Sequence, residues 1–212
     1  MNIKILAAET IRGISSLVIC FMSIIILSSG CKNDGPTSPG NGALSLSFQS
    51  NKGNFSASGK YDTTATSGSG VGAFRSTDSK RISVFAYRFN SSADVDVIIM
   101  LISDTVAIHT TTYHYGPSDD ILAFYFYPHV NPAGSSGLGY PYRLSSGDLA
   151  ITGIASEGIQ GTFAGKGVHA VNPSDSIIVS NGTFNSVMEV ISSTEPMQIN
   201  KRFDFRFPME KK

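Results

Sequence analysis

The feature that most constrains the fold of this chain is an alternation of apolar and polar residues with a period of two. The segment LSLSF at 44–48 and the segment FDFRF at 203–207 both follow it. Successive side chains of a β-strand point to opposite faces, so each pattern predicts a strand with one buried and one wet face. No window of useful length shows helical spacing. The chain is therefore predicted to fold as an all-β protein.

Other strands are predicted to be buried on both faces. The runs ISVFAYRF (82–89), VIIMLI (97–102) and ILAFYFY (121–127) are almost entirely apolar, as central strands are. Pro128 follows the third run and is expected to end it, since proline donates no ladder hydrogen bond. Turn formers recur every ten to fifteen residues, as in TSGSG, NSSAD, YGPSDD, VNPAGSSGLG and VNPSDS. This spacing predicts a single antiparallel β-sandwich or barrel-like domain of about 9–10 strands.

Several glycines in the C-terminal half predict local features of the backbone. Gly161, Gly165 and Gly167 interrupt an apolar strand, where glycine marks a bulge or a close approach of two backbones. Asn181-Gly182 suits either a two-residue hairpin turn or a bulge. We favour the bulge, because a hairpin there would leave short flanking strands.

The N-terminal sequence is typical of an export signal. Lys4 and Arg12 precede an uncharged apolar run at 13–27, which is shorter than the roughly 20 residues that span a bilayer. Ser28-Ser29-Gly30 then stand directly before Cys31, and this arrangement resembles the lipobox of bacterial lipoproteins. Ser28 occupies the place that usually holds leucine. The resemblance implies a signal peptide at 1–30 and acylation, such as palmitate, of Cys31.

The second cysteine, Cys20, lies inside the apolar run and would leave with the signal. Cys31 would then have no intramolecular disulfide partner, and lipidation explains this odd cysteine. Residues 31–42 carry hardly any apolar side chain and are predicted to be a flexible tether to the β domain at 43–212. The expected location is the cell envelope, at the periplasmic or surface-facing leaflet of the outer membrane.

The charge composition argues against nucleic acid as a partner. The chain has 16 Lys and Arg and 16 Asp and Glu; Lys4, Arg12 and Glu9 would leave with the signal, so the mature net charge is near −1. A nucleic-acid-binding protein needs a basic face, which this balance does not offer. Charged residues make up only 15% of the chain, as suits an exported β protein.

Two segments carry a family resemblance. The strand-like sequence GDLAITGIASEGIQGTFAGKG (147–167), followed by SIIVSNGTF (176–184), resembles small β-rich lipoproteins of Bacteroidetes. The opening GNFSASGKY (53–61) is similar to the first strand of that group. The resemblance implies tight strand packing and a lipid anchor, and it brings no catalytic residues.

No residue pattern predicts catalysis. No Gly-x-Ser-x-Gly nucleophile elbow follows Cys31. His109 and His114 are five residues apart and would face opposite sides of one strand, so a shared metal is not expected, and no cofactor is implied. Asp94 and Asp96 share a face, which we interpret as a solvated strand face that discourages edge pairing. We expect a protein that is not an enzyme.

Aromatic residues in the middle of the chain suggest a binding surface. Tyr113, Tyr115, Tyr140 and Tyr142 are flanked by turn residues and are predicted to form an exposed aromatic patch for a glycan or a protein. The function predicted first is a lipid-anchored envelope protein that acts as a binding or interaction module. The alternative is a calycin-like barrel that holds a small apolar or amphipathic ligand, and an envelope hydrolase comes third.

Overall fold

The computed structural model describes residues 38–62, 64–115, 122–132 and 139–191. The predicted signal peptide, Cys31, most of the tether and the alternating segment at 203–207 lie outside these residues. Within them the chain forms ten strands of one sheet and is all-β, as predicted. The strands are β1 Ser45–Ser50, β2 Phe55–Ser58, β3 Ser69–Ser76, β4 Arg81–Ser91, β5 Asp94–Ser103, β6 Thr112–Tyr115, β7 Leu122–Val130, β8 Tyr142–Ile154, β9 Gly158–His169 and β10 Ser176–Ile191.

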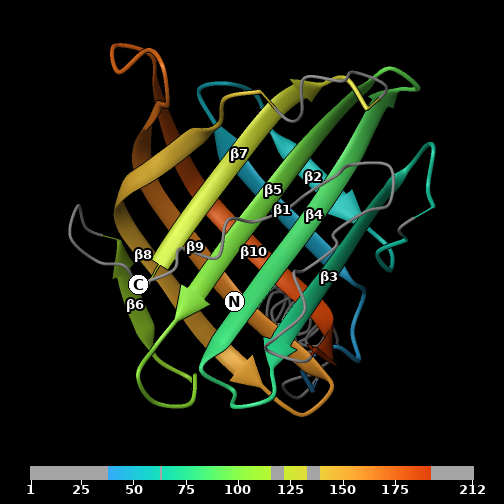
Figure 1. Cartoon of the computed structure of the whole chain (residues 1–212), viewed down its shortest axis with the longest axis vertical. Helices are drawn as coiled ribbons and strands as arrows, with labels where there is room; N and C mark the ends of the chain where they lie inside the picture. Colours follow the sequence, from blue (N-terminus) through green and yellow to red (C-terminus); the bar gives the residue numbers. More distant parts are fainter. Residues whose placement is uncertain (1–37, 63, 116–121, 133–138, 192–212) are drawn as a thin grey trace, which may run out of the picture. The chain divides into compact units, whose positions relative to one another are not determined.

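The sheet closes into a barrel, which decides between the two predicted architectures. Seven strands form the ring in the order β3, β4, β5, β7, β8, β9 and β10 (Figure 1). The 16-residue strand β10 closes it, because its first part pairs with β9 and its last residues, Met188–Ile191, pair with β3. The β10–β3 pairing is parallel, whereas the other strand pairings are antiparallel. The hairpin β1–β2 continues from β10, and β6 is added to β8.

A bulge interrupts the part of β10 that pairs with β9. The register with β9 shifts between Val179 and Gly182, and Asn181 has a positive φ of 52°. Asparagine adopts this left-handed conformation more readily than most residues. The bulge predicted at Asn181-Gly182 is therefore confirmed, and β10 continues through it to Ile191.

Close contact between backbones explains two of the glycines in β9. A Cβ on Gly161 would lie 2.3 Å from the carbonyl oxygen of Ala150, and one on Gly167 would lie 2.1 Å from that of Arg143. Both oxygens belong to β8, so any side chain at these positions would push the paired strands apart. The predicted close approach of backbones is confirmed at both positions.

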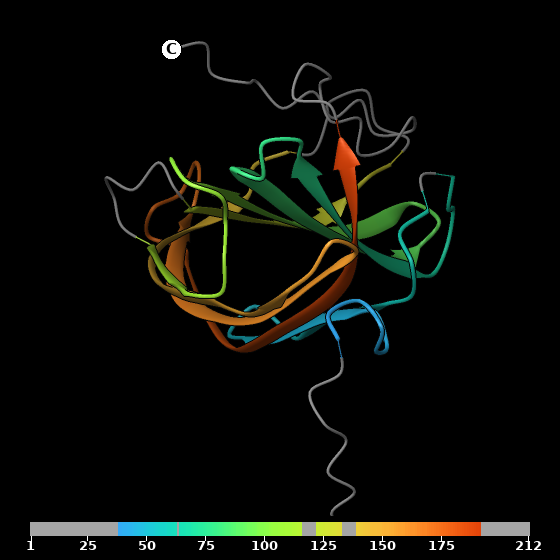
Figure 2. The ribbon, with the colours of Figure 1, turned by 90° about the horizontal axis from the view of Figure 1, so that it is seen from below.

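Side chains fill the barrel interior. On β5, the alternate residues Ile98, Met100 and Ile102 point inward and are at most 1% exposed. Aromatic rings from five places in the chain meet beside them, with centroid separations of 5.5 to 6.3 Å, namely Phe48, Phe55, Phe124, Phe126 and Phe163. Figure 2 shows the curved layer of β8, β9 and β10 facing the layer of β3, β4 and β5 across this core.

A second apolar cluster lies on the outside of the barrel wall. It occupies the outward face of β4, β5 and β7, and we call it the outer apolar face. Its buried members are Phe85, Tyr87, Val95, Val97, Ile99 and Val130, with Tyr61, Ala65, Phe89, Leu101, Tyr125 and Tyr127 packed partly buried against them. These strands are thus apolar on both faces, as the continuous runs in their sequences predict.

Among the described residues, no helix has the length and apolar character required to cross a bilayer.

Candidate functional site

A pocket of about 110 Å³ lies at the end of the barrel where β1 turns into β2 and β4 turns into β5. Its walls combine cationic, acidic and amide side chains with a small apolar surface from Phe126 and Pro128. The residues that line it are Lys52, Gly53, Asn54, Arg88, Asn90, Asp96, Phe126, Pro128 and His129. Charged groups gather here because the inward-facing positions of β4 and β5 become polar as these strands leave the core.

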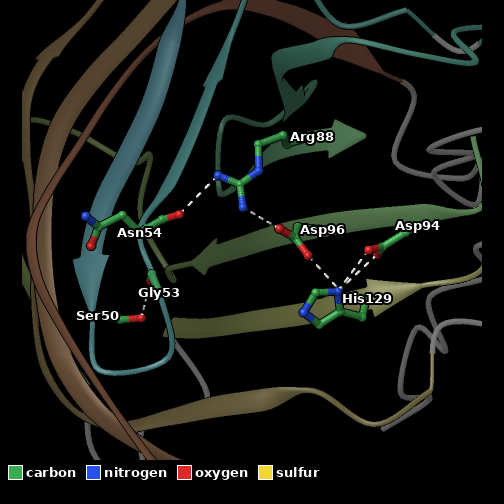
Figure 3. Close-up of polar contacts among 7 residues, drawn as sticks. All are labelled: Ser50, Gly53, Asn54, Arg88, Asp94, Asp96 and His129. Atoms are coloured by element: carbon green, nitrogen blue, oxygen red, sulfur yellow. Dashed lines mark hydrogen bonds and ion pairs between the residues drawn. The ribbon is translucent and has the colours of Figure 1, made fainter. Parts of the chain in front are cut away.

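An ion pair between Arg88 and Asp96 forms the base of this site (Figure 3). The two residues are register partners on β4 and β5, and both stand on the side that faces the interior. Nη2 of Arg88 lies 2.6 Å from Oδ2 of Asp96, and its Nη1 donates to the carbonyl of Asn54 at 3.0 Å. The side chain of Asp96 is 5% exposed, and the guanidinium lies 5.2 Å from the ring centroid of Phe55. The pair therefore joins β4, β5 and the start of β2.

A bulge in β7 brings His129 to the same place. Val95 pairs with Val130 and Val97 with Tyr127, so Pro128 and His129 together stand opposite the single residue Asp96. His129 has a positive φ of 56°, and its backbone N–H donates to Oδ1 of Asp96 at 3.0 Å. The prediction that Pro128 ends this strand is wrong. A bulge leaves a residue without a ladder partner, which accommodates the missing N–H of proline, and β7 continues to Val130.

The imidazole of His129 pairs with Asp94. Its Nδ1 lies 3.0 Å from Oδ2 of Asp94, and three quarters of the His129 side chain is exposed. The hydrogen bond to Asp94, together with the negative charge of that carboxylate, raises the pKa of His129 above its ordinary value. When protonated, the imidazole adds a cation to the rim of the pocket.

Three of these side chains could hold a metal ion. Asp94, Asp96 and His129 each offer one ligand atom, and these atoms lie within 4.8 Å of one another. Two carboxylates and one imidazole suit several divalent metals. However, both oxygens of Asp96 already accept hydrogen bonds, from Arg88 and from the His129 backbone. The guanidinium therefore already supplies positive charge beside the carboxylate that a metal would need.

A second charged network lies at the same end of the barrel. Lys52, which lines the pocket, forms an ion pair with Asp175, and the hydroxyl of Tyr142 donates to the other oxygen of that carboxylate at 2.6 Å. Hydrogen bonds from Lys52 and then Tyr142 lower the pKa of Asp175. The ring of Tyr142 stacks on Phe126 with a centroid separation of 6.4 Å. Tyr142 thus connects the rim of the pocket with the core.

The predicted aromatic patch is wrong for three of its four members. Tyr113, Tyr115 and Tyr142 are buried, with exposed fractions of 7%, 6% and 8%, and belong to the interior core, whereas Tyr140 is 64% exposed. Burial raises the pKa of Tyr115. The period-two alternation of β6 and β8 turns these rings inward, and flanking turn residues do not reveal that direction.

Sequence reasoning did not bring together the residues of the actual pocket. The predicted solvated strand face is wrong for Asp96, which is buried on the central strand β5. His129 lies 33 to 35 residues away from the two aspartates in the sequence, so no local pattern connects it with them. The available signal was a Pro-His pair at the end of an apolar strand, next to a strand that begins with two like-facing acids.

Comparison of the chain with protein-family models, curated proteins and solved structures returned no match. The resemblance to small β-rich lipoproteins of Bacteroidetes stays a prediction.

Proposed function

We propose that this protein is a lipid-anchored component of the cell envelope, that its barrel is a non-catalytic binding module, and that it binds through the pocket at the barrel end. The single observation that carries the binding proposal is the contrast between two regions. The interior is filled by phenylalanine and aliphatic side chains, whereas the barrel end offers a pocket lined by side chains held in ion pairs. This contrast favours binding at the barrel end over an apolar ligand held inside.

The charges of the pocket favour a neutral, hydroxyl-rich ligand, the chemistry of a saccharide. Each cation near the pocket has an acidic partner, since Arg88 pairs with Asp96, Lys52 with Asp175 and protonated His129 with Asp94. The net charge of these groups is therefore about zero, which gives no long-range attraction for an ion. Hydrogen-bond donors and acceptors fixed side by side suit hydroxyl groups, because a hydroxyl group both donates and accepts hydrogen bonds.

The residues that line the pocket also support a role without catalysis. Among the residues that the structure describes, those lining the pocket include no serine, threonine or cysteine that His129 could activate as a nucleophile. Asp96 accepts two hydrogen bonds and is buried beside a guanidinium, an arrangement that holds its position and its charge. These features stabilise a binding surface.

Native mass spectrometry of the protein extracted from its own envelope tests the anchor and the alternative ligand mode together. We expect a covalent mass increase that is lost in the Cys31→Ala variant, because the thiol is the acylation site. The same mass shift in both proteins would refute lipidation at Cys31. A non-covalent apolar mass retained by both would refute the barrel-end proposal and favour the calycin-like alternative.

Ligand-observed NMR with a panel of neutral mono- and oligosaccharides tests the pocket itself. Asn90→Ala removes an amide from the pocket wall without touching the ion pairs, and Thr162→Ala changes an exposed residue of β9 as a matched control. We expect saccharide signals that weaken in Asn90→Ala and persist in Thr162→Ala. Equal signals in both variants, or none with the unaltered protein, would refute the saccharide proposal.

A further inference from the structure

The outer apolar face is a second surface of the molecule on which a packing partner is expected. Val97 and Ile99 on β5 are 0% exposed and Phe85 on β4 is 1% exposed, although all three point away from the barrel interior. β4, β5 and β7 lie side by side across this face (Figure 1). A contiguous apolar surface spread over three strands is the kind of surface that another segment or another molecule covers.

The described part of the chain accounts for cover on one side of this face. The ring of Tyr61 packs edge-on against Phe85, with centroids 5.0 Å apart, and also contacts Phe74 on β3 and Tyr87 on β4. Tyr61 thus belongs to the β3–β4 side. The β5–β7 side carries the neighbouring rings of Tyr125 and Tyr127, whose centroids are 6.4 Å apart.

We propose that the C-terminal segment 192–212 docks on the outer apolar face through Phe203, Phe205 and Phe207. The period of the segment matches that of the face. In the sequence RFDFRF at 202–207 the three phenylalanines share one side of an extended chain, and Arg202, Asp204 and Arg206 share the other. An extended chain of this kind presents an apolar side to the face and a charged side to water.

The length of the chain beyond β10 supports this occupant. β10 ends at Ile191, which pairs with Ser76 at the end of β3. From β3 to β7 is three strand spacings, or about 15 Å, whereas residues 192–202 can extend over roughly 35 Å. Phe203 to Phe207 would cover about 14 Å of strand, which fits within the roughly 20 Å from Val95 to Leu101 on β5. The segment therefore reaches the face and is short enough to lie on it.

The titration of a face residue agrees with a covered surface. Burial, and secondarily the charge of neighbouring Tyr125, raises the pKa of Tyr127 to about 12. Tyr127 and Tyr125 are thus natural reporters of the cover, and the chain has no tryptophan to obscure tyrosine absorbance. Exposed Tyr140, at 64%, serves as an internal reference.

Tyrosine nitration mapped by mass spectrometry tests the docking on the chain 31–212 carrying Cys31→Ser, which removes the competing thiol. The test variant is Phe203→Ser/Phe205→Ser/Phe207→Ser, and the matched control is Arg202→Ser/Asp204→Ser/Arg206→Ser. We expect Tyr125 and Tyr127 to react roughly tenfold faster in the phenylalanine variant, relative to Tyr140, and to stay protected in the control. The pKa of Tyr127 should also fall toward the ordinary value of about 10. Fast reaction in the unaltered protein, or unchanged protection in the phenylalanine variant, would overturn the proposal.

A cross-link keeps the proposal testable if the phenylalanine variant unfolds. Leu101→Cys with Phe205→Cys, in the same Cys31→Ser background, should form an intramolecular disulfide on mild oxidation. Leu101→Cys with Arg206→Cys should form it much more slowly, because Arg206 is on the opposite side of the segment. Equal rates for the two pairs would contradict the predicted orientation. Cross-linked dimers as the main product, with a dimer in light scattering, would assign the face to a second copy of the chain instead.

Discussion

Replacing Arg88 with methionine should destabilise the barrel strongly, because it leaves a buried carboxylate without its cation. Asp96 is 5% exposed and would keep one hydrogen bond, the 3.0 Å contact from the backbone N–H of His129. Removing one partner of a buried pair typically costs 3–5 kcal/mol. Arg88 itself is 32% exposed, so water screens part of the interaction, and we expect a loss of about 3 kcal/mol. Methionine retains the aliphatic volume of arginine, which limits the contribution of packing.

The double variant separates the ion pair from other effects. Asp96→Leu alone should cost about 2 kcal/mol, since Arg88 remains partly hydrated and bound to the carbonyl of Asn54. If the two substitutions were additive, the double variant would lose about 5 kcal/mol. We expect it to lose only about 2 kcal/mol, mainly for the unpaired N–H of His129. The difference of about 3 kcal/mol is the coupling between the two charges.

Urea denaturation followed by circular dichroism measures each free energy of unfolding. The matched control is Lys60→Met, because Lys60 and Glu189 form an ion pair at 3.3 Å whose side chains are 65% and 57% exposed. An exposed pair contributes only about 0–1 kcal/mol. For a domain of this size the Arg88 variant should also melt about 6–12 °C lower. A loss no larger than that of Lys60→Met, or an additive double variant, would refute this account of the site.

Three further predictions use the same denaturation assay. Gly167→Ala should cost at least about 2 kcal/mol, because its Cβ would lie 2.1 Å from the Arg143 carbonyl, and a loss below about 0.5 kcal/mol would contradict the close approach. Phe124→Ala should cost about 3–5 kcal/mol, since this 0%-exposed ring fills the interior, and a smaller loss would indicate a looser core than the structure shows. The raised pKa of His129 stabilises the fold fully below about pH 6.5, and this stabilisation disappears as the pH rises through the pKa of the folded state. Relative to His129→Gln, the protein should therefore gain a few tenths of a kcal/mol at pH 5.5 and nothing at pH 8.5, with Asp94→Asn removing the difference; a gain that grows with pH would be the wrong sign.

The fold class could be predicted because the local sequence patterns of the strands agree with the tertiary structure. Strands such as β4 and β5 are long and continuously apolar, and their sequences predict central strands without knowledge of their neighbours. The bulge at Asn181 was also predictable, because asparagine tolerates a positive φ that few other residues adopt. The prediction for Pro128 was wrong because a proline ends a regular strand but is tolerated in a bulge, and pairing with β5 creates that bulge.

The candidate site depended on register, which the sequence does not display. Arg88 and Asp96 meet because β4 and β5 pair with these two residues opposite each other, and a register shift of one residue would place the two side chains on opposite faces of the sheet. The predicted tyrosine patch was wrong for the same reason, because Tyr113 and Tyr115 lie on the strand face that points into the core.

By itself, the sequence determined the all-β class, the number of strands and the positions where backbones approach closely, because these depend on side-chain period and on the conformational range of single residues. Tertiary structure alone decided that the sheet closes, through the parallel pairing of the end of β10 with β3. It also decided that Asp94, Asp96 and His129 lie together, and which of the two apolar faces of β4, β5 and β7 lies on the outside of the barrel. The physical reason is that closure, register and facing direction depend on contacts between residues far apart in the chain.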